Sequence, residues 1–193
     1  MDFRALVDHL LAEFFRLDPV HATEIGNHEH DGAWPDLSPA GAEIRRAFAQ
    51  DALRQLGEID RASLDRDDAI DHRILTDALA AMEFGETTLQ EERWNPLVYV
   101  YVLGNGLFAL LARPFAPLPE RLASAASRLR GVPAVLDAAR ANLLDPGDRP
   151  VARFHTEKAI ERLPGIPGLV DAVLAEVDKV EDADAAAALR AEL

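Results

Sequence analysis

Residues Pro96 to Ala112, Pro-Leu-Val-Tyr-Val-Tyr-Val-Leu-Gly-Asn-Gly-Leu-Phe-Ala-Leu-Leu-Ala, decide the fold class of this chain. The stretch Val98 to Val102 is β-branched and aromatic, and by itself it favours a strand. A single strand would have no partner, because no other segment alternates apolar and polar residues convincingly. We therefore predict a buried helix here, with tertiary packing overriding the local propensity.

On the N-terminal side of this stretch, apolar residues recur with the period of a helix. Asp18-Pro19 and Ser38-Pro39 each supply an N-cap followed by a proline at the first helical position. Gly26 stands where the short helix between them would end. The next helix carries Ile44 on its apolar stripe, and a longer one is expected from Leu64-Asp65 toward Glu92.

On the C-terminal side, glycine and proline divide the helical pattern into shorter pieces. Gly131 is expected to cap one helix and Val132-Pro133 to open the next. Short helices are expected from Thr156 and, after a Pro164–Gly168 hinge, over Leu169–Val180. The prediction is an all-α fold, an irregular array of about eight helices. It forms a single domain over residues 1–193 or the N-terminal part of a larger one.

Composition excludes several function classes. The net charge is −14, from 34 acidic and 20 basic residues, so nucleic acid and anionic membrane surfaces are poor partners. The chain has no cysteine, which excludes disulfides, thiolate metal sites and a cysteine nucleophile. It has neither a secretory signal pattern nor an apolar run long enough to span a membrane. We therefore expect a cytoplasmic protein.

The segment Gly26 to Ser38 concentrates the groups that could carry chemistry, because it holds His28, His30, Asp31 and Asp36 in a turn-rich loop. A His-x-His pair on an extended loop can bind a divalent ion. The same residues can instead make turn and capping hydrogen bonds. We favour the second interpretation, in which these residues order the loop or line a cleft.

Trp94 and Asn95 form a second candidate, in which an indole wall and an amide orient a peptide. The alternative is a helix boundary where Trp94 packs and Asn95 caps, and we favour it.

Several blocks occur in the order found in one bacterial family. These blocks are Asp18-Pro19, His28, Asp31, Trp34-Pro35-Asp36, Trp94-Asn95-Pro96-Leu97, Arg113-Pro114, Arg128-Leu129 and Thr156-Glu157-Lys158-Ala159-Ile160. Together they resemble the N-terminal part of the family known as domain of unknown function 885. The resemblance spans nearly the whole chain.

The resemblance implies a zinc metallopeptidase whose site is a His-Glu-x-x-Pro-Gly-His helix in the C-terminal half. Two histidines one helical turn apart hold the zinc, and the glutamate polarises its water. This sequence contains no such motif, so zinc is expected only with a C-terminal half and no cofactor in this chain. We expect a non-catalytic region that contributes to a substrate cleft, with a peptide as its ligand. The alternative is a free-standing all-α binding or protein-interaction module.

If this region packs against a C-terminal half in a larger protein, an apolar helix face would lack its partner in this chain. The segments Leu97–Leu111 and Leu169–Val180 are the most apolar candidates. We expect one of them to contact a C-terminal half or a second copy of the chain in a homo-oligomer.

Overall fold

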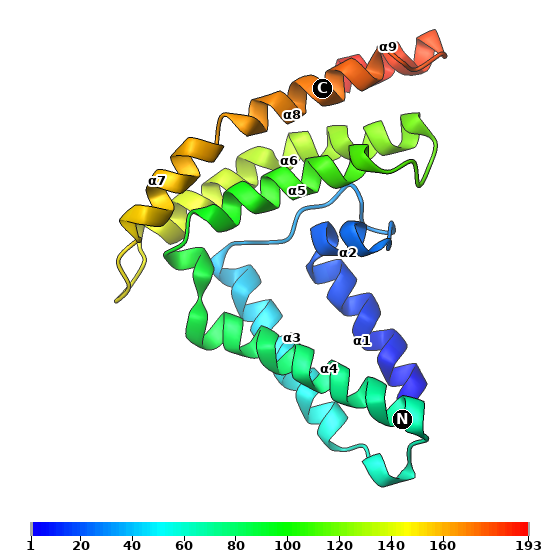
Figure 1. Ribbon diagram of the computed structural model, residues 1–193, viewed down its shortest axis with the longest axis vertical. Helices are drawn as coiled ribbons and strands as arrows, with labels where there is room; N and C mark the ends of the chain where they lie inside the picture. The colour runs from blue at the N-terminus through cyan, green and yellow to red at the C-terminus, as the bar shows by residue number, and fades with distance from the viewer. Residues whose placement is uncertain (1, 193) are drawn as a thin grey trace.

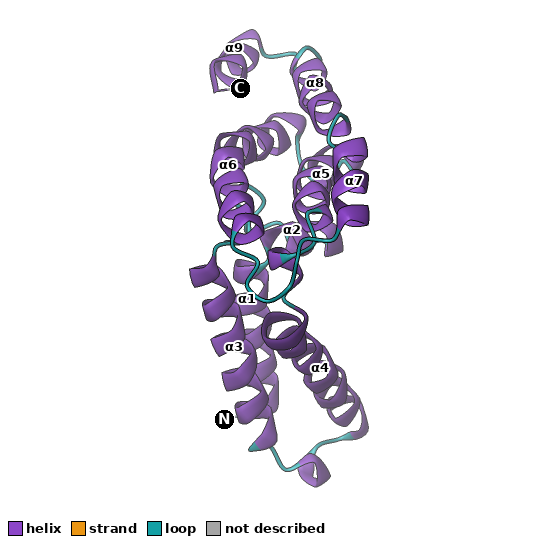
Figure 2. Cartoon of the chain, turned by 90° about the vertical axis from the view of Figure 1, so that its left-hand side faces the viewer, coloured by secondary structure: helices purple, strands orange, loops and turns teal. Residues whose placement is uncertain are grey.

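The computed structural model describes residues 2–192, which contain nine α-helices and no strand (Figures 1 and 2). The predicted all-α fold is confirmed. The decisive stretch forms helix α5 (Leu97–Ala112), as predicted. Its β-branched and aromatic side chains are accommodated because Tyr99, Val100 and Leu103 are buried against neighbouring helices.

One group of helices comprises α1 (Phe3–Leu17), α3 (Pro39–Gly57) and α4 (Arg66–Phe84), with the short 3₁₀ turn η1 (Arg61–Ser63) joining α3 to α4. In Figure 1 these helices form the lower part of the molecule, with α3 and α4 packed side by side. They share one apolar core. Its buried members are Phe3, Leu6, Leu10, Ala52, Leu56 and Leu79.

The second group surrounds α5 and the long helix α6 (Leu118–Leu144), which pack against each other. Helices α7 (Arg153–Arg162), α8 (Gly165–Val177) and α9 (Ala183–Glu192) follow, and α8 and α9 cover one side of the pair (Figure 1). This group has its own core. Its buried members are Leu110, Leu122, Ala125, Val173, Val177, Ala186 and Leu189.

Two connections join the groups. Helix α2 (Pro19–Ile25) packs against α5, and the loop over residues 26–38 runs from α2 to the start of α3 (Figure 1). The other connection is a π-helical turn, η2 (Gly85–Leu89), followed by a 3₁₀ turn, η3 (Glu91–Arg93), which leads from α4 into α5.

The helix starts predicted at Asp18 and Ser38 are confirmed, because both side chains form N-cap hydrogen bonds. The Asp18 side chain accepts the backbone N–H of His21 at 3.1 Å, and the Ser38 hydroxyl accepts that of Gly41 at 3.2 Å. Gly26 ends α2 with φ = 99°, a left-handed conformation that favours glycine.

The predicted break at Gly131 and Pro133 is wrong, because both residues lie inside α6, a single helix of 27 residues. Gly131 serves a close approach instead. A Cβ there would lie 2.6 Å from Cδ1 of Trp34, and a Cβ on Gly106 of α5 would lie 2.2 Å from its Cζ3. The Trp34 indole thus fits between two helices where both lack a side chain, and its Nε1 donates to the Arg128 carbonyl at 2.6 Å.

Two other boundaries and the buried face of α3 differ from the sequence prediction. The helix expected to reach Glu92 ends at Phe84 and gives way to the π turn. Ile44 is 51% exposed, because the buried stripe of α3 instead follows Gly41, Arg45, Ala49, Ala52 and Leu56. The residues expected to form a hinge begin α8 at Gly165, since a proline within the first helical turn sacrifices no intrahelical hydrogen bond.

Of the two apolar segments expected to lack a partner, Leu97–Leu111 is largely covered, whereas in Leu169–Val180 only Val173 and Val177 are buried. Single large side chains of both segments remain exposed. Phe108 of α5 is 59% exposed, Tyr101 47% and Leu174 of α8 42%. Within the described range, no single helix is long and apolar enough to cross a membrane. The pair Arg66–Arg93 and Leu97–Ala112, bent by 101°, passes that test of length and composition only when taken together.

Candidate functional site

A buried arginine of α3 organises the place where the two helix groups meet. The Arg45 side chain is 8% exposed, and its Nε donates to Oε1 of Glu86 at 2.5 Å. Its Nη2 donates to Oε2 of Glu86 at 3.2 Å and to Oε1 of Glu92 at 2.6 Å, and its Nη1 donates to the Asp36 carbonyl. One guanidinium therefore ties together the loop before α3, the π turn and the 3₁₀ turn.

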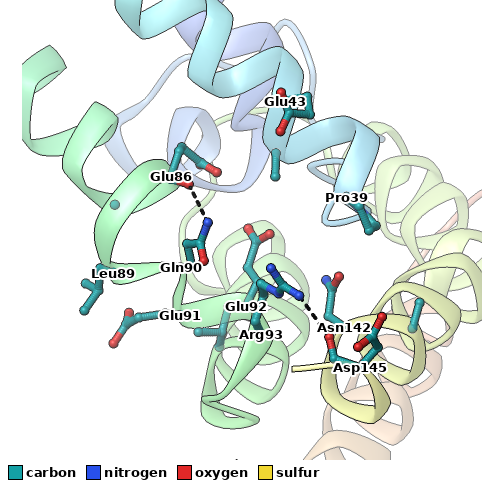
Figure 3. A pocket seen from close by; sticks show the side chains of 14 residues that line it. Pro39, Glu43, Glu86, Leu89, Gln90, Glu91, Glu92, Arg93, Asn142 and Asp145 are labelled. Carbon is teal, nitrogen blue, oxygen red and sulfur yellow. Dashed lines mark hydrogen bonds between the residues drawn. The ribbon is translucent and has the colours of Figure 1, made fainter. Parts of the chain in front are cut away.

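A cavity of about 450 Å³ opens beside this guanidinium, between α3, the η2–η3 turns and the C-terminal end of α6. Figure 3 shows Glu43, Glu86, Glu92 and Asn142 arranged around it. Its volume lies in the range of small-molecule sites, roughly 300–1,000 Å³. The polar side chains of the wall are Glu43, Glu86, Gln90, Glu91, Glu92, Arg93, Asn142 and Asp145.

The two carboxylates that share Arg45 differ in their environment. Burial raises the pKa of Glu92 from 4.5 to about 7, and the negative charge of Glu86 adds to the rise while Arg45 opposes it. Burial alone would lower the pKa of Arg45, but its hydrogen bonds and charge contacts with Glu86 and Glu92 outweigh burial and raise it. Glu92 is therefore a carboxyl group that exchanges its proton near neutral pH, next to a cavity.

Two polar side chains from the second helix group hold the Glu92 segment in place. The Tyr99 hydroxyl of α5 donates to the Glu92 carbonyl at 2.7 Å and accepts from Nδ2 of Asn142 at 2.8 Å. Nδ2 of Asn142 also donates to the Leu37 carbonyl at 2.7 Å. Burial raises the pKa of Tyr99 to about 12, so the hydroxyl keeps its proton and remains a donor.

The wall at Gln90 is conformationally unusual. Gln90 has φ = 48°, the left-handed region that residues other than glycine seldom adopt, and its N–H bonds the Gly85 carbonyl at 2.7 Å across the π turn. Arg149, from the loop after α6, donates to the carbonyls of Thr88 and Leu89 and so fixes the far end of this turn. Both π turns and left-handed residues occur frequently at functional sites.

Three of the four candidate residues of the loop, His28, His30 and Asp31, do not line this cavity. Nδ1 of His28 lies 3.0 Å from Oδ2 of Asp31, and the His28 ring stacks on Phe115 with centroids 3.6 Å apart. Asp31 is buried and accepts from the Thr23 hydroxyl at 2.7 Å. His30 contributes its backbone carbonyl to a turn. Within residues 2–192 no three His, Asp or Glu side chains are placed to hold a metal ion.

The other three candidates lie around the cavity rather than in its wall. Oδ1 of Asp36 accepts the N–H of Ser38 at 2.9 Å, while its carbonyl binds Arg45. The Trp94 indole donates to the Leu89 carbonyl at 2.8 Å. Oδ1 of Asn95 accepts the N–H of Leu97, the first residue of α5, at 3.2 Å. Through these hydrogen bonds the three residues hold the segments around η2 and η3, whose residues line the cavity.

Sequence reasoning missed Arg45, Glu86, Glu92 and Asn142. One pattern could have pointed to Arg45, which occupies the buried stripe of α3 where an apolar residue would be expected. A charged residue at such a position needs buried partners. Glu86 and Glu92 look in the sequence like solvated acids, and only the π turn brings both to Arg45.

Comparison with known proteins places the chain in a family. Residues 19–193 match the model of a family described as bacterial protein of unknown function, DUF885. A solved structure from Shewanella oneidensis, of a candidate lipoprotein of unknown function, is similar over 98% of this chain at a TM-score of 0.84 and 28% identity. The match covers 34% of that longer protein, and no curated protein matches the sequence. This chain belongs to the DUF885 family.

Proposed function

We propose that this chain is the helical frame of a metallopeptidase-like DUF885 protein, forming one wall of a peptide-binding cleft without being catalytic by itself. The observation that carries the proposal is that nearly the whole chain (98%) matches the fold of about a third (34%) of a longer protein. The absence of a His-Glu-x-x-Pro-Gly-His segment from the sequence agrees with a region that leaves the chemistry to other residues.

The charge of the chain favours the same ligand class. With a net charge of −14, the protein repels nucleic acid and anionic membrane surfaces, whereas a peptide with basic groups is attracted. We place the protein in the cytoplasm as part of this proposal. The exposed side chains of α5 and α8, Tyr101, Phe108 and Leu174, supply contacts for the rest of such a protein or for a second copy.

Metal analysis and a peptidase assay on the purified 193-residue chain test the proposal. We expect no zinc above background after purification without added metal, and no hydrolysis of a quenched-fluorescence peptide library. Stoichiometric zinc, or hydrolysis that a chelator abolishes, would show that the chain builds its own catalytic centre and would overturn the proposal.

A free-standing binding module is the second candidate, and the cavity beside Arg45 is the observation that favours it. The two candidates predict different behaviour for a chimera in which this chain replaces the matching third of a longer relative. If the chain is a cleft wall, the chimera should be soluble and should hydrolyse peptides, as the proposal expects of the relative itself. A free-standing module gives a chimera without activity, although the isolated chain still binds its ligand.

A further inference from the structure

The cavity beside Arg45 contains an unused hydrogen-bond acceptor on a buried side chain. Asn142 is 5% exposed and lines the cavity. The Leu37 carbonyl can only accept a hydrogen bond, so the amide atom 2.7 Å from it must be the nitrogen. The second hydrogen of that nitrogen goes to the Tyr99 hydroxyl, whose own hydrogen goes to the Glu92 carbonyl. Oδ1 is left over, and no residue of the described range donates to it.

The other polar groups around the cavity are also mainly acceptors. Five carboxyl groups belong to the wall, against the single cation of Arg93, with Arg45 behind Glu86 and Glu92. The hydrogens of Arg45 that point toward Glu86 and Glu92 are taken by those carboxylates. A ligand group that satisfies this wall must bring hydrogen-bond donors and positive charge, because a further anion would be repelled.

The remainder of the wall is apolar. Pro39, Ala42, Leu89 and Val98 line the same cavity as the carboxylates. An aliphatic stem can pack against such a surface while its charged end reaches the polar groups.

We propose that this cavity binds an alkylammonium or alkylguanidinium group, whose N–H donors contact Oδ1 of Asn142 and the carboxylates of Glu86 and Glu92. The site is independent of the peptidase-like role, since it rests on the cavity alone. The same chemistry is offered by a lysine or arginine side chain of a peptide and by a free aliphatic amine.

Proton exchange at Glu92 couples this binding to pH. Glu92 faces Arg45 of α3, Asp36 of the preceding loop, Glu86 of the π turn, and the Tyr99–Asn142 pair of α5 and α6. A bound cation favours the ionised carboxylate, so binding near neutral pH releases a proton. Since the pKa of Glu92 is about 7, affinity should rise by about tenfold between pH 6 and pH 8.

The test is an NMR titration of the intact chain with n-butylammonium and n-butylguanidinium at both pH values, with n-butanol as the neutral probe. We expect shifts at the backbone amides of residues 85–93 and 141–142, tighter binding at pH 8, and no comparable shifts with butanol. Glu92→Gln should weaken binding at pH 8 by about tenfold and remove the pH dependence. Glu120→Gln, which removes an equal charge from an exposed position of α6, should change neither.

Each outcome decides the proposal. Absence of saturable cation binding, equal shifts with butanol, or full affinity in a folded Glu92→Gln protein would overturn it. Circular dichroism establishes that the variant is folded. An acetylated, amidated lysine peptide then identifies the source. Tighter binding than butylammonium indicates a peptide ligand and equal binding indicates a free amine, and both results support the site.

Discussion

Arg128 and Arg45 are buried arginines that connect the two helix groups, and they differ in the groups that accept their hydrogen bonds. Arg128 of α6 is fully buried (0% exposed) and donates only to neutral acceptors. Arg45 of α3 is bound by the carboxylates of Glu86 and Glu92 and adjoins a cavity. The first position resembles a packed core and the second a binding site.

The contacts of Arg128 explain why that position is structural. Its Nη2 donates to the Pro19 carbonyl at 3.1 Å and to the Thr23 hydroxyl at 2.8 Å, and its Nε donates to the Ala33 carbonyl at 3.1 Å. Its guanidinium carbon lies 5.5 Å from the Trp34 ring centre. Burial lowers the pKa of Arg128 to about 10, yet the group stays charged at neutral pH, so its contacts do not change there.

This difference explains why the contacts of Arg128 should be constant with pH (the rigid junction), whereas those of Arg45 should change with pH (the responsive junction). Backbone carbonyls and a hydroxyl do not titrate, so the Arg128 junction is constant over the working range of pH. One partner of Arg45 does titrate there, because burial raises the pKa of the Glu92 carboxyl to about 7. We therefore propose a functional role for the Arg45 junction and a structural one for the Arg128 junction.

Arg128→Met should have the largest effect. It leaves buried acceptors on α2, α5 and the connecting loop without a donor, and we expect a loss of about 3–5 kcal/mol in the free energy of unfolding. Urea denaturation followed by circular dichroism measures it. Arg140→Met, at a side chain that is 71% exposed, is the matched control and should change stability by less than about 0.5 kcal/mol. Similar losses in both variants would remove the distinction between the two junctions.

Glu92→Gln should change how stability depends on pH. Folding raises the pKa of Glu92 from 4.5 to about 7. The contribution of protonated Glu92 to the free energy of unfolding is thus fully present below pH 4.5, and it is lost as the pH rises through 7. Relative to wild type, the variant should gain up to about 3 kcal/mol between pH 4.5 and pH 8. Thermal unfolding across this range measures the difference, and a constant offset would contradict the assignment.

Gly106→Ala tests the packing of Trp34 at the rigid junction. The new methyl group would lie 2.2 Å from Cζ3 of the indole, so the ring must move away from both helices. We expect a loss of about 1–3 kcal/mol and a change in tryptophan fluorescence, despite the higher helix propensity of alanine. Gly57→Ala, where no atom lies within 4 Å of the added Cβ, should be neutral or slightly stabilising. Equal behaviour of the two variants would count against the tight fit.

His28→Ala should have the smallest effect. It removes a hydrogen bond to buried Asp31 and a stacking contact with Phe115, and we expect a loss of about 1 kcal/mol. His30→Ala, in the same loop, should be close to neutral. A larger loss for His30 than for His28 would contradict the role that the contacts of His28 suggest. Chemical denaturation of the pair provides the comparison.

The local part of this architecture could be predicted from the sequence, and the long-range part could not. Asp18, Gly26 and Ser38 act through backbone groups a few residues away, so their caps were predictable. Gly131 was misinterpreted as a helix end because its purpose is the contact with Trp34, far away in sequence. Helix α6 tolerates Pro133 because tertiary packing outweighs the lost hydrogen bond.

In the candidate site, too, local features could be predicted from the sequence and long-range contacts could not. Asp36 belongs to a turn-rich loop, and Trp94 and Asn95 offer an indole and an amide that could orient a peptide, so the sequence indicates all three, and they lie next to the cavity. Its central groups come from α3, a π turn, a 3₁₀ turn and α6, and no local sequence pattern near Glu86 or Asn142 indicates its partner. A π turn depends on packing rather than on a local motif, so the meeting of Arg45 with both glutamates was beyond sequence reasoning.

The most direct test of the responsive junction is the pKa of Glu92 itself. The ¹³C resonance of its side-chain carboxyl, assigned by its disappearance in Glu92→Gln, can be followed from pH 3 to pH 9. We predict a midpoint at about pH 7, well above those of solvent-exposed glutamates in the same spectra. A midpoint close to the ordinary value of 4.5 would mean that the carboxylate is ionised throughout the neutral range and that the contrast between the two arginine junctions is wrong.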